Sequence, residues 1–186
     1  MKSVKMILSL TIICAVAGVV LAKTYSVTNP KIEDDKKAKI IENLSKVIDA
    51  DHFESSIPDT LWYALDKDND TLGIVFKSSG SGFGGPIEAL VGLGNNGKIV
   101  GVKIATPGEG LQETPGLGVK VSEPKFMDQF KGKVLEDLKI TRDGGEIDAI
   151  TAATISSRGA TNGIYDAVKK YEKYLPKKEV KDVPEE

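Results

Sequence analysis

A long apolar run near the N-terminus is the strongest hydrophobic pattern in the chain. It extends over residues 6–22, holds only two hydroxyl residues, and has lysines on both sides. A helix rises about 1.5 Å per residue, so this run spans roughly 25 Å, and lysine side chains extend it toward a hydrocarbon core of about 30 Å. We therefore expect residues 1–23 to form a single transmembrane anchor in contact with membrane lipid. A cleaved signal peptide that ends at residues 20–22 is the alternative.

The charges around this run predict its orientation. Lys2 and Lys5 precede it, and positive charge favours the cytoplasmic side of a membrane. The N-terminus is therefore expected in the cytoplasm, and the rest of the chain on the extracytoplasmic side of the cell membrane. Residues 24–57 are expected to form a helical linker or stalk, because apolar residues between Ile40 and Ile48 recur at helical spacing.

The remaining pattern combines short β-rich segments with amphipathic helices. Strands are expected at residues 61–65, 71–77, 87–93, 98–105 and 137–142. Helices are expected at 124–130 and from about Ser157 to Tyr174. This order predicts an α+β fold, a mostly antiparallel sheet with flanking helices, preceded by one N-terminal transmembrane helix. The folded domain is expected to span residues 58–175, with a charged, flexible tail at 176–186.

Composition excludes several classes of function. The net charge is −2, from 25 basic and 27 acidic residues, so a nucleic-acid partner is not expected. One cysteine rules out an internal disulfide, and one cysteine with one histidine cannot supply a zinc site of Cys and His ligands. A histidine-based triad would depend on His52 alone. We therefore expect neither a metal site nor a catalytic acid or base.

Glycine, serine and threonine concentrate in three segments, and these carry the candidate chemistry. The segments are Gly80-Ser81-Gly82-Phe83-Gly84-Gly85, Glu113-Thr114-Pro115-Gly116-Leu117-Gly118, and the stretch from Asp148 to Ser157. Glycine lets a backbone approach a ligand closely, and hydroxyls at a helix start can help its N–H groups to hold an anion. Flexible turns and helix capping are the alternatives, although a cap needs one hydroxyl and the third segment has four.

These segments, in this order, resemble the FMN-binding domain of the G subunit of Rnf electron-transport complexes. The related C subunit of Na⁺-translocating NADH:quinone reductase is similar. Residues 113–118 match the family's loop without change, and residues 148–157 resemble its flavinylation motif, Asp-x-x-Ser/Thr-Gly-Ala-Thr with Ser-Ser close behind. The resemblance covers roughly Gly80 to Leu175. In one departure, Ala152 occupies the position of the family's glycine, where a methyl group restricts positive φ.

The resemblance implies a covalently held cofactor. In the family, a flavin transferase takes the FMN moiety from FAD and joins it by a phosphoester to the last threonine of the motif. That residue is Thr154 in this chain. The motif's acidic residue, Asp148 here, is implied in recognition by the transferase. The expected cofactor is therefore FMN, covalently attached to Thr154.

The same resemblance implies which further residues hold the flavin. The implied cofactor-binding residues are Gly82, Phe83, Glu113, Thr114, Leu117, Gly118, Thr151, Thr154, Ser156 and Ser157. The loop at 113–118 would line the flavin ring or its ribityl chain. Phe83 or Tyr63 would pack on a face of the ring, and core packing is the alternative role for Tyr63. Ser156 and Ser157 would hold the phosphate at the helix start.

The implied role is that of an electron-transfer component in a membrane-bound, ion-translocating ferredoxin:NAD⁺ oxidoreductase. Its partners would be the other membrane and peripheral subunits of that complex. The chain would have no complete catalytic activity alone, because the cofactor carries the redox chemistry. The C subunit of the quinone reductase, a stand-alone extracytoplasmic FMN-binding domain and a flavin-free anchored binding domain are the alternatives.

Overall fold

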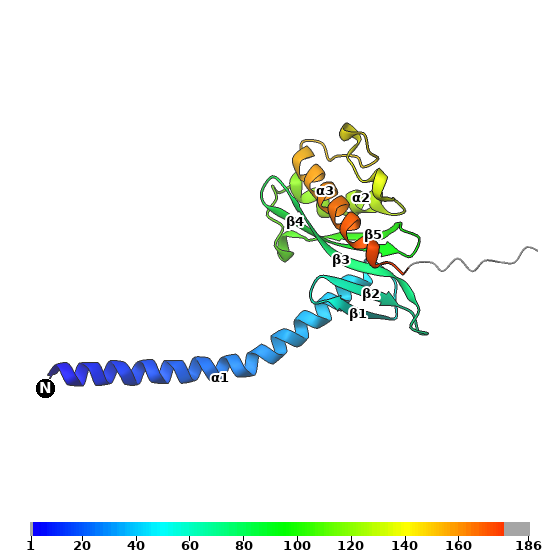
Figure 1. The fold of residues 1–186 in the computed structure, drawn as a ribbon. Helices are drawn as coiled ribbons and strands as arrows, with labels where there is room; N and C mark the ends of the chain where they lie inside the picture. The colour runs from blue at the N-terminus through cyan, green and yellow to red at the C-terminus, as the bar shows by residue number, and fades with distance from the viewer. Residues whose placement is uncertain (1, 177–186) are drawn as a thin grey trace, which may run out of the picture. The chain divides into compact units, whose positions relative to one another are not determined.

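The computed structural model describes residues 2–176, apart from the side chains of residues 2–5, 8, 9 and 27–37. The chain divides into two compact units, Met1–Ile41 and Glu42–Glu186. Helix α1 (Lys2–Ser45) forms the described part of the first unit and continues into the second (Figure 1). Nearly all of the tail expected over 176–186 lies outside the described residues.

The first unit is helical throughout its described residues, as expected for residues 2–23. Over the part of the chain that the structure describes, no helix is both long and apolar enough to cross a membrane. The transmembrane anchor expected over residues 1–23 therefore stays a prediction.

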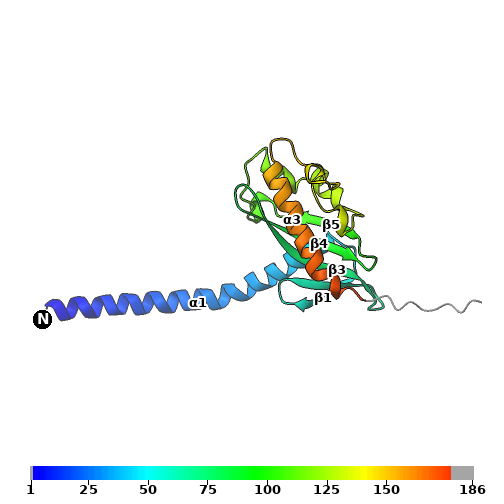
Figure 2. The same cartoon turned by 45° about the horizontal axis from the view of Figure 1, so that its top comes forward.

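A five-stranded sheet forms the centre of the second unit (Figure 2). Its strands are β1 (His52–Ile57), β2 (Leu61–Leu65), β3 (Thr71–Ser81), β4 (Pro86–Gly94) and β5 (Ile99–Ile104). Each strand pairs antiparallel with its neighbour in sequence, in the order β1-β2-β3-β4-β5. The four strands expected between residues 61 and 105 are confirmed, and so is the α+β class with an antiparallel sheet.

Strand β1 is an element that the sequence pattern does not predict. Most of its residues are exposed, so they show no alternation of apolar and polar positions. They also lie within residues 24–57, where a helix is expected. The strand stands at the edge of the sheet and pairs only with β2. An edge strand needs one partner and tolerates polar residues, which explains why its sequence carries little signal.

Helix α3 (Thr154–Tyr171) lies across β3 and β4 and covers one face of the sheet (Figures 1 and 2). It confirms the C-terminal helix and begins a few residues earlier than expected. Phe76 of β3 meets Tyr171 of α3 with ring centroids 5.0 Å apart. Alternate strand residues point toward the helix, because successive side chains of a strand face opposite sides. The buried residues of this layer include Ile74, Phe76, Ile87, Val91, Leu93, Ala160, Ile164, Val168 and Tyr171.

Glycines bring α3 and β3 into backbone contact. A Cβ atom on Gly159 would lie 2.1 Å from the carbonyl oxygen of Ser81, and one on Gly163 would lie 2.6 Å from the nitrogen of Gly80. Backbone atoms cannot yield to such contacts cheaply, so no larger residue fits at either helix position. The first half of α3 is therefore fixed against the end of β3.

The opposite face of the sheet receives the end of α1 and the turn that follows it. Leu44, Val47 and Ile48 are buried there. Gly92 of β4 pairs with Gly101 of β5, and a Cβ atom on Gly101 would lie 2.5 Å from the carbonyl oxygen of Val47. Glycine is thus required where this turn crosses the β4–β5 pair.

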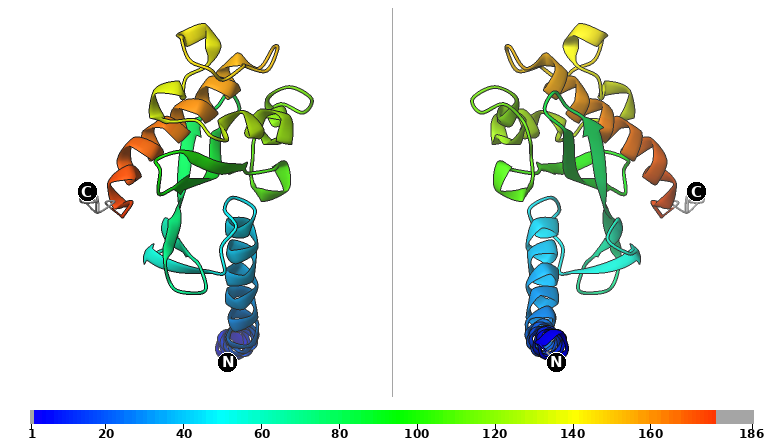
Figure 3. Two further views of the ribbon diagram at one scale, coloured as in Figure 1. Left: turned by 90° about the vertical axis from the view of Figure 1, so that its right-hand side faces the viewer. Right: turned by 90° about the vertical axis from the view of Figure 1, so that its left-hand side faces the viewer.

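Between β5 and α3 the chain gathers around the first turns of α3 (Figure 3). Helix α2 (Pro124–Met127) continues into the 3-10 helix η3 (Asp128–Phe130), which confirms the helix expected over 124–130. The N–H of Ile104 donates to Sδ of Met127 at 3.2 Å and ties the end of β5 to α2. This segment, together with α3, frames the candidate site.

The prediction of a strand over residues 137–142 is wrong. The structure has two 3-10 helices there, η4 (Leu135–Asp137) and η5 (Thr141–Asp143), and an isolated bridge joins Ile140 to Ile147. Leu138 and Ile140 are buried, so their alternation with polar residues reflects real burial. Their backbone groups nevertheless close local turns and do not join the sheet.

Candidate functional site

The carboxylate of Glu113 joins the three segments rich in glycine and hydroxyl residues. Glu113 is buried, with only 7% of its surface exposed. Oε1 accepts hydrogen bonds from the backbone N–H groups of Phe83 at 2.7 Å and Gly84 at 3.2 Å. Oε2 accepts a hydrogen bond from the hydroxyl of Ser156 at 2.8 Å. Residues that stand 30, 29 and 43 positions from Glu113 thus meet at one side chain.

The carboxylate fits because two neighbouring residues are glycines without side chains. A Cβ atom on Gly82 would lie 2.1 Å from Oε1 of Glu113. One on Gly118 would lie 2.2 Å from Oε2 and 2.8 Å from Oγ of Ser156. A side chain at either position would displace Glu113. The group that the glycine-rich backbone approaches closely is therefore a carboxylate of the same chain.

A tight turn leads into α3. The N–H of Ala153 donates to the carbonyl oxygen of Ile150 at 2.9 Å, and Ala152 has a φ of 64°. A positive φ at the third position is typical of a type II turn, where glycine is the residue that fits without strain. The backbone thus adopts the conformation that favours the family's glycine, with alanine in its place. Left-handed alanine costs roughly 1–2 kcal/mol.

The hydroxyl of Ser157 holds this turn against the helix. It accepts a hydrogen bond from the N–H of Ile150 and donates one to the carbonyl oxygen of Ala153, each at 3.0 Å. Ser157 is fully buried, and the hydroxyl of the buried Ser156 donates a hydrogen bond to Glu113. Ser156 and Ser157 are expected to hold a phosphate, yet in this structure both hydroxyls have partners within the protein.

Thr154 stands apart from these serines. It is the first residue of α3 and is partly exposed. Within the part of the chain that the structure describes, its hydroxyl has no hydrogen-bond partner, and the same holds for the exposed Thr151. The first N–H groups of a helix lack intrahelical acceptors and form the positive end of its dipole. An anion attached to Thr154 would meet a favourable field.

Exposed apolar side chains border the start of α3. Phe83 is 70% exposed, Ile155 is 53% exposed and Leu117 is 40% exposed. Phe83 donates its N–H to Glu113, while Ile155 and Leu117 directly precede Ser156 and Gly118 of the same cluster. Because large apolar side chains are usually buried, these three mark a surface suited to an apolar group.

A groove of about 410 Å³ adjoins the turn before α3. Ligand clefts commonly measure about 300–1,000 Å³. Its lining residues are Lys120, Glu123, Lys125, Phe126, Gln129, Asp148, Ala149, Ile150 and Thr151. Residues 148–151 thus form one wall, and the α2 region forms the other.

Asp148 is held by its backbone and exposed at its side chain. Its N–H donates to Oε1 of Gln129 at 2.7 Å, and Nε2 of Gln129 donates to its carbonyl oxygen at 3.3 Å. The carboxylate stays accessible, since the residue is exposed. No sequence pattern identifies Gln129, because a contact between residues 19 positions apart leaves no periodic signal.

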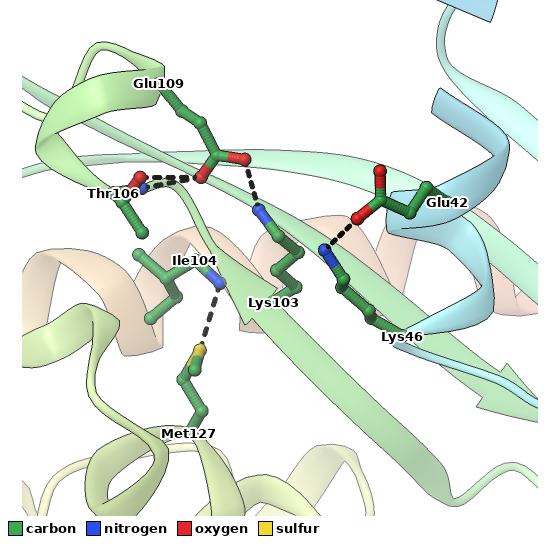
Figure 4. Close-up of polar contacts among 7 residues, drawn as sticks. All are labelled: Glu42, Lys46, Lys103, Ile104, Thr106, Glu109 and Met127. Carbon is green, nitrogen blue, oxygen red and sulfur yellow. Dashed lines mark hydrogen bonds and ion pairs between the residues drawn. The ribbon is translucent and has the colours of Figure 1, made fainter. Parts of the chain in front are cut away.

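A second carboxylate, Glu109, lies nearby in the sequence but in a different setting (Figure 4). Nζ of Lys103 donates to Oε1 at 2.7 Å, and the N–H and hydroxyl of Thr106 donate to Oε2 at 2.9 and 3.0 Å. Burial raises the pKa of Glu109, but the hydrogen bonds from Lys103 and Thr106 and the charge of Lys103 outweigh it. The pKa is lowered from 4.5 to about 2.

The structure brings together half of the ten residues predicted to bind the cofactor. Gly82, Phe83, Glu113, Gly118 and Ser156 form one cluster, which we call the Glu113 cluster. Thr114 contributes through its backbone, since its carbonyl oxygen accepts the N–H groups at positions 117 and 119 and closes the loop. The exposed Ile155 and the lysines of the groove are additions that residue type alone does not single out.

Known proteins are similar to this chain over most of its length. The FMN-binding domain family matches residues 82–169. The chain is 35% identical over 165 residues to the G subunit of the proton-translocating ferredoxin:NAD(+) oxidoreductase complex of Clostridium ljungdahlii, with 86% of each chain covered. It is 30% identical over 176 residues to the G subunit of the ion-translocating oxidoreductase complex of Methanosarcina acetivorans, covering 88% of this chain and 92% of that one.

A solved structure shares the fold. The C subunit of the Na(+)-translocating NADH-quinone reductase of Parabacteroides distasonis superposes with a TM-score of 0.51 at 24% identity, over 63% of each chain. The matched domain covers the whole Glu113 cluster, the turn at residues 150–153 and most of α3. The chain therefore belongs to the Rnf-type family of G subunits of ion-translocating oxidoreductase complexes and contains its FMN-binding domain.

Proposed function

We propose that this chain is an electron-transfer component of an ion-translocating ferredoxin:NAD⁺ oxidoreductase and that it carries FMN covalently on Thr154. The relative in Clostridium ljungdahlii is the G subunit of such a complex. The observation that carries the proposal is the convergence of all three segments on Glu113, at the first turn of a helix that begins with Thr154, whose hydroxyl is unpaired in the described structure. The partners are the other subunits of the complex.

Thr154 is the hydroxyl of the motif best placed to form a phosphoester. The hydroxyls of Ser156 and Ser157 are buried and already bonded, which leaves Thr151 and Thr154. Of these two, Thr154 begins α3. A phosphoester replaces the hydroxyl proton and keeps a negative charge, which the helix dipole and the first N–H groups stabilise.

The residues around Thr154 fit a flavin. The flavin ring is flat and largely apolar, and the exposed side chains of Phe83, Leu117 and Ile155 offer a matching surface. The groove of about 410 Å³ beside the turn has the size of a ligand cleft. When bound, FMN takes up and releases electrons, while the chain's own residues orient it and limit its contact with water.

Maturation and membrane attachment complete the proposal. The exposed carboxylate of Asp148, on a backbone fixed by Gln129, suits recognition by a flavin transferase. We also place the chain in the cell membrane through residues 1–23, with the FMN-binding domain on the extracytoplasmic side. The apolar run and the lysines before it support this topology.

The test is the intact mass of the full chain, produced together with a flavin transferase and denatured before measurement. A mass gain of one FMN less water, mapped to the peptide that contains Thr154, is expected. Thr154→Val should abolish the gain, and Thr151→Val is the matched control that should retain it. A gain that persists in Thr154→Val overturns this attachment residue. An unmodified wild-type chain, with an active transferase present, overturns the covalent cofactor.

A further inference from the structure

Glu113 holds together parts of the chain that the family resemblance assigns only to flavin contact. A carboxylate that is 7% exposed loses its hydration and is retained only where hydrogen bonds replace water. Here Oε1 receives the successive N–H groups of Phe83 and Gly84, and Oε2 receives the hydroxyl of Ser156. Both oxygens therefore bind groups of the chain itself.

One of the groups that Glu113 binds, the hydroxyl of Ser156, belongs to the same turn of α3 as Thr154. The side chain of Phe83 is 70% exposed, so its position depends on the backbone that Glu113 holds. Ser156 lies in the first turn of α3, two positions after Thr154. A change in the length of this side chain should therefore shift the Phe83 loop relative to the start of α3.

The carboxylate has a fixed position as well as fixed partners. Gly82 stands against Oε1 and Gly118 against Oε2, each without room for a Cβ atom. A side chain enclosed in this way cannot rotate without breaking its bonds to Phe83 and Ser156. The cluster is rigid because the two carboxylate oxygens of Glu113 bind backbone N–H groups and a hydroxyl and also pack against two glycines.

Glu113 also places a negative charge close to the start of α3. Among the described residues it has no ion-pair partner, so only N–H and O–H dipoles offset this charge. Little solvent reaches the side chain, and its field is therefore weakly screened. A fixed negative charge near a redox group makes the uptake of electrons less favourable.

We infer that Glu113 is a positioning residue for the flavin: its buried carboxylate fixes the Phe83 loop against the first turn of α3, and its charge lowers the flavin's reduction potential. This role rests on the proposed function, since it concerns an FMN on Thr154. It differs from direct binding, because the carboxylate acts through Phe83 and Ser156.

Two substitutions in the full, flavinylated chain separate charge from position. Glu113→Gln keeps the length and an oxygen for the N–H groups but removes the charge, so the midpoint potential of the flavin should rise. Glu113→Asp keeps the charge but shortens the side chain, so the visible circular dichroism of the flavin should change. The matched control is Glu109→Gln, which removes an exposed carboxylate outside the Glu113 cluster and should alter neither signal.

An unchanged potential in Glu113→Gln together with an unchanged dichroism spectrum in Glu113→Asp overturns the inference. A failure of the proposed function has a different signature, a wild-type chain without covalent flavin in the intact-mass measurement. If neither Glu113 variant folds, Ser156→Ala removes one donor from the same carboxylate. Altered dichroism in Ser156→Ala then supports the positioning role, and an unaltered spectrum rejects it.

Hydrogen exchange gives a readout that needs no flavin. In the full chain without FMN, the amide protons of Phe83 and Gly84 should exchange faster in Glu113→Ala than in the wild type, because they lose their acceptor. Amide protons within β4 provide the internal reference and should keep their rates. Equal exchange of the two loop amides in both chains contradicts the proposed hold on the loop.

Discussion

Glu109 and Glu113 lie in one short loop, yet they make contacts of opposite kinds. Glu109 is at the surface, and its partners Lys103 and Thr106 are 6 and 3 positions away. Glu113 is buried, and its partners are 29 to 43 positions away. Local bonds shape one end of the loop, whereas long-range bonds connect its other end to the turn between β3 and β4 and to α3. The same residue type therefore stabilises a turn in one place and assembles a site in the other.

Glycine substitutions near Glu113 and near Glu109 should differ most in their effect on the free energy of unfolding. In Gly118→Ala the new methyl group would meet Glu113 and Ser156 at 2.2 and 2.8 Å, and neither can move without losing its bond. The free energy of unfolding should fall by about 1–3 kcal/mol. Gly108→Ala is the matched control near Glu109, where the nearest atom is 3.9 Å away, and it should cost less than about 0.5 kcal/mol. Chemical denaturation of both variants measures the difference, and equal losses would break the comparison.

A smaller contrast is expected from backbone strain. Ala152 has a φ of 64° beside the site, and Gly110 has a φ of 107° after Glu109. Ala152→Gly should raise the free energy of unfolding by about 0.5–1 kcal/mol, because relief of left-handed strain exceeds the entropy that glycine adds to the unfolded chain. Gly110→Ala should lower it by about 1 kcal/mol. Thermal unfolding should show opposite shifts in Tm, and shifts of the same sign would contradict this assignment of strain.

The smallest effect on stability is expected when Glu109 is protonated at low pH. Its pKa in the folded chain is about 2, below the ordinary value of 4.5, so its charged form stabilises the fold. This contribution is fully present above about pH 4.5 and is lost as the pH falls toward about 2. The side chain is 37% exposed, so solvent screening should keep the contribution below about 1 kcal/mol. Glu109→Gln should lose correspondingly less stability in acid than the wild type, and identical pH profiles would show that the ion pair contributes nothing.

Much of the fold can be predicted from the sequence because its main elements bury one face. The alternation in β4 and the helical spacing in α3 both come from contact with a single core. The exceptions have physical reasons. Strand β1 is exposed and carries no alternation, and the apolar residues at 138 and 140 are buried by turns, which leave the same local pattern as a strand.

The three segments of the candidate site can be recognised in the sequence, but their arrangement cannot. Unusual runs of glycine and hydroxyl residues identify the three segments, because those residue types suit close approach and anion binding. Their meeting at Glu113 depends on contacts between distant positions, which periodicity does not encode. Likewise, the sequence does not distinguish the bonded hydroxyls of Ser156 and Ser157 from the unbonded one of Thr154 in the described structure.

The long-range bonds of Glu113 also bear on the order in which we expect the site to assemble. The sheet is built from neighbouring strands and can form by local pairing, whereas the bond to Ser156 closes a loop of 43 positions. During synthesis Phe83 and Glu113 leave the ribosome before α3, so the carboxylate gains its last donor when the C-terminal helix docks. If a transferase recognises the finished turn, it acts on chains that have completed this docking. Attachment of the flavin would then record that the domain has folded.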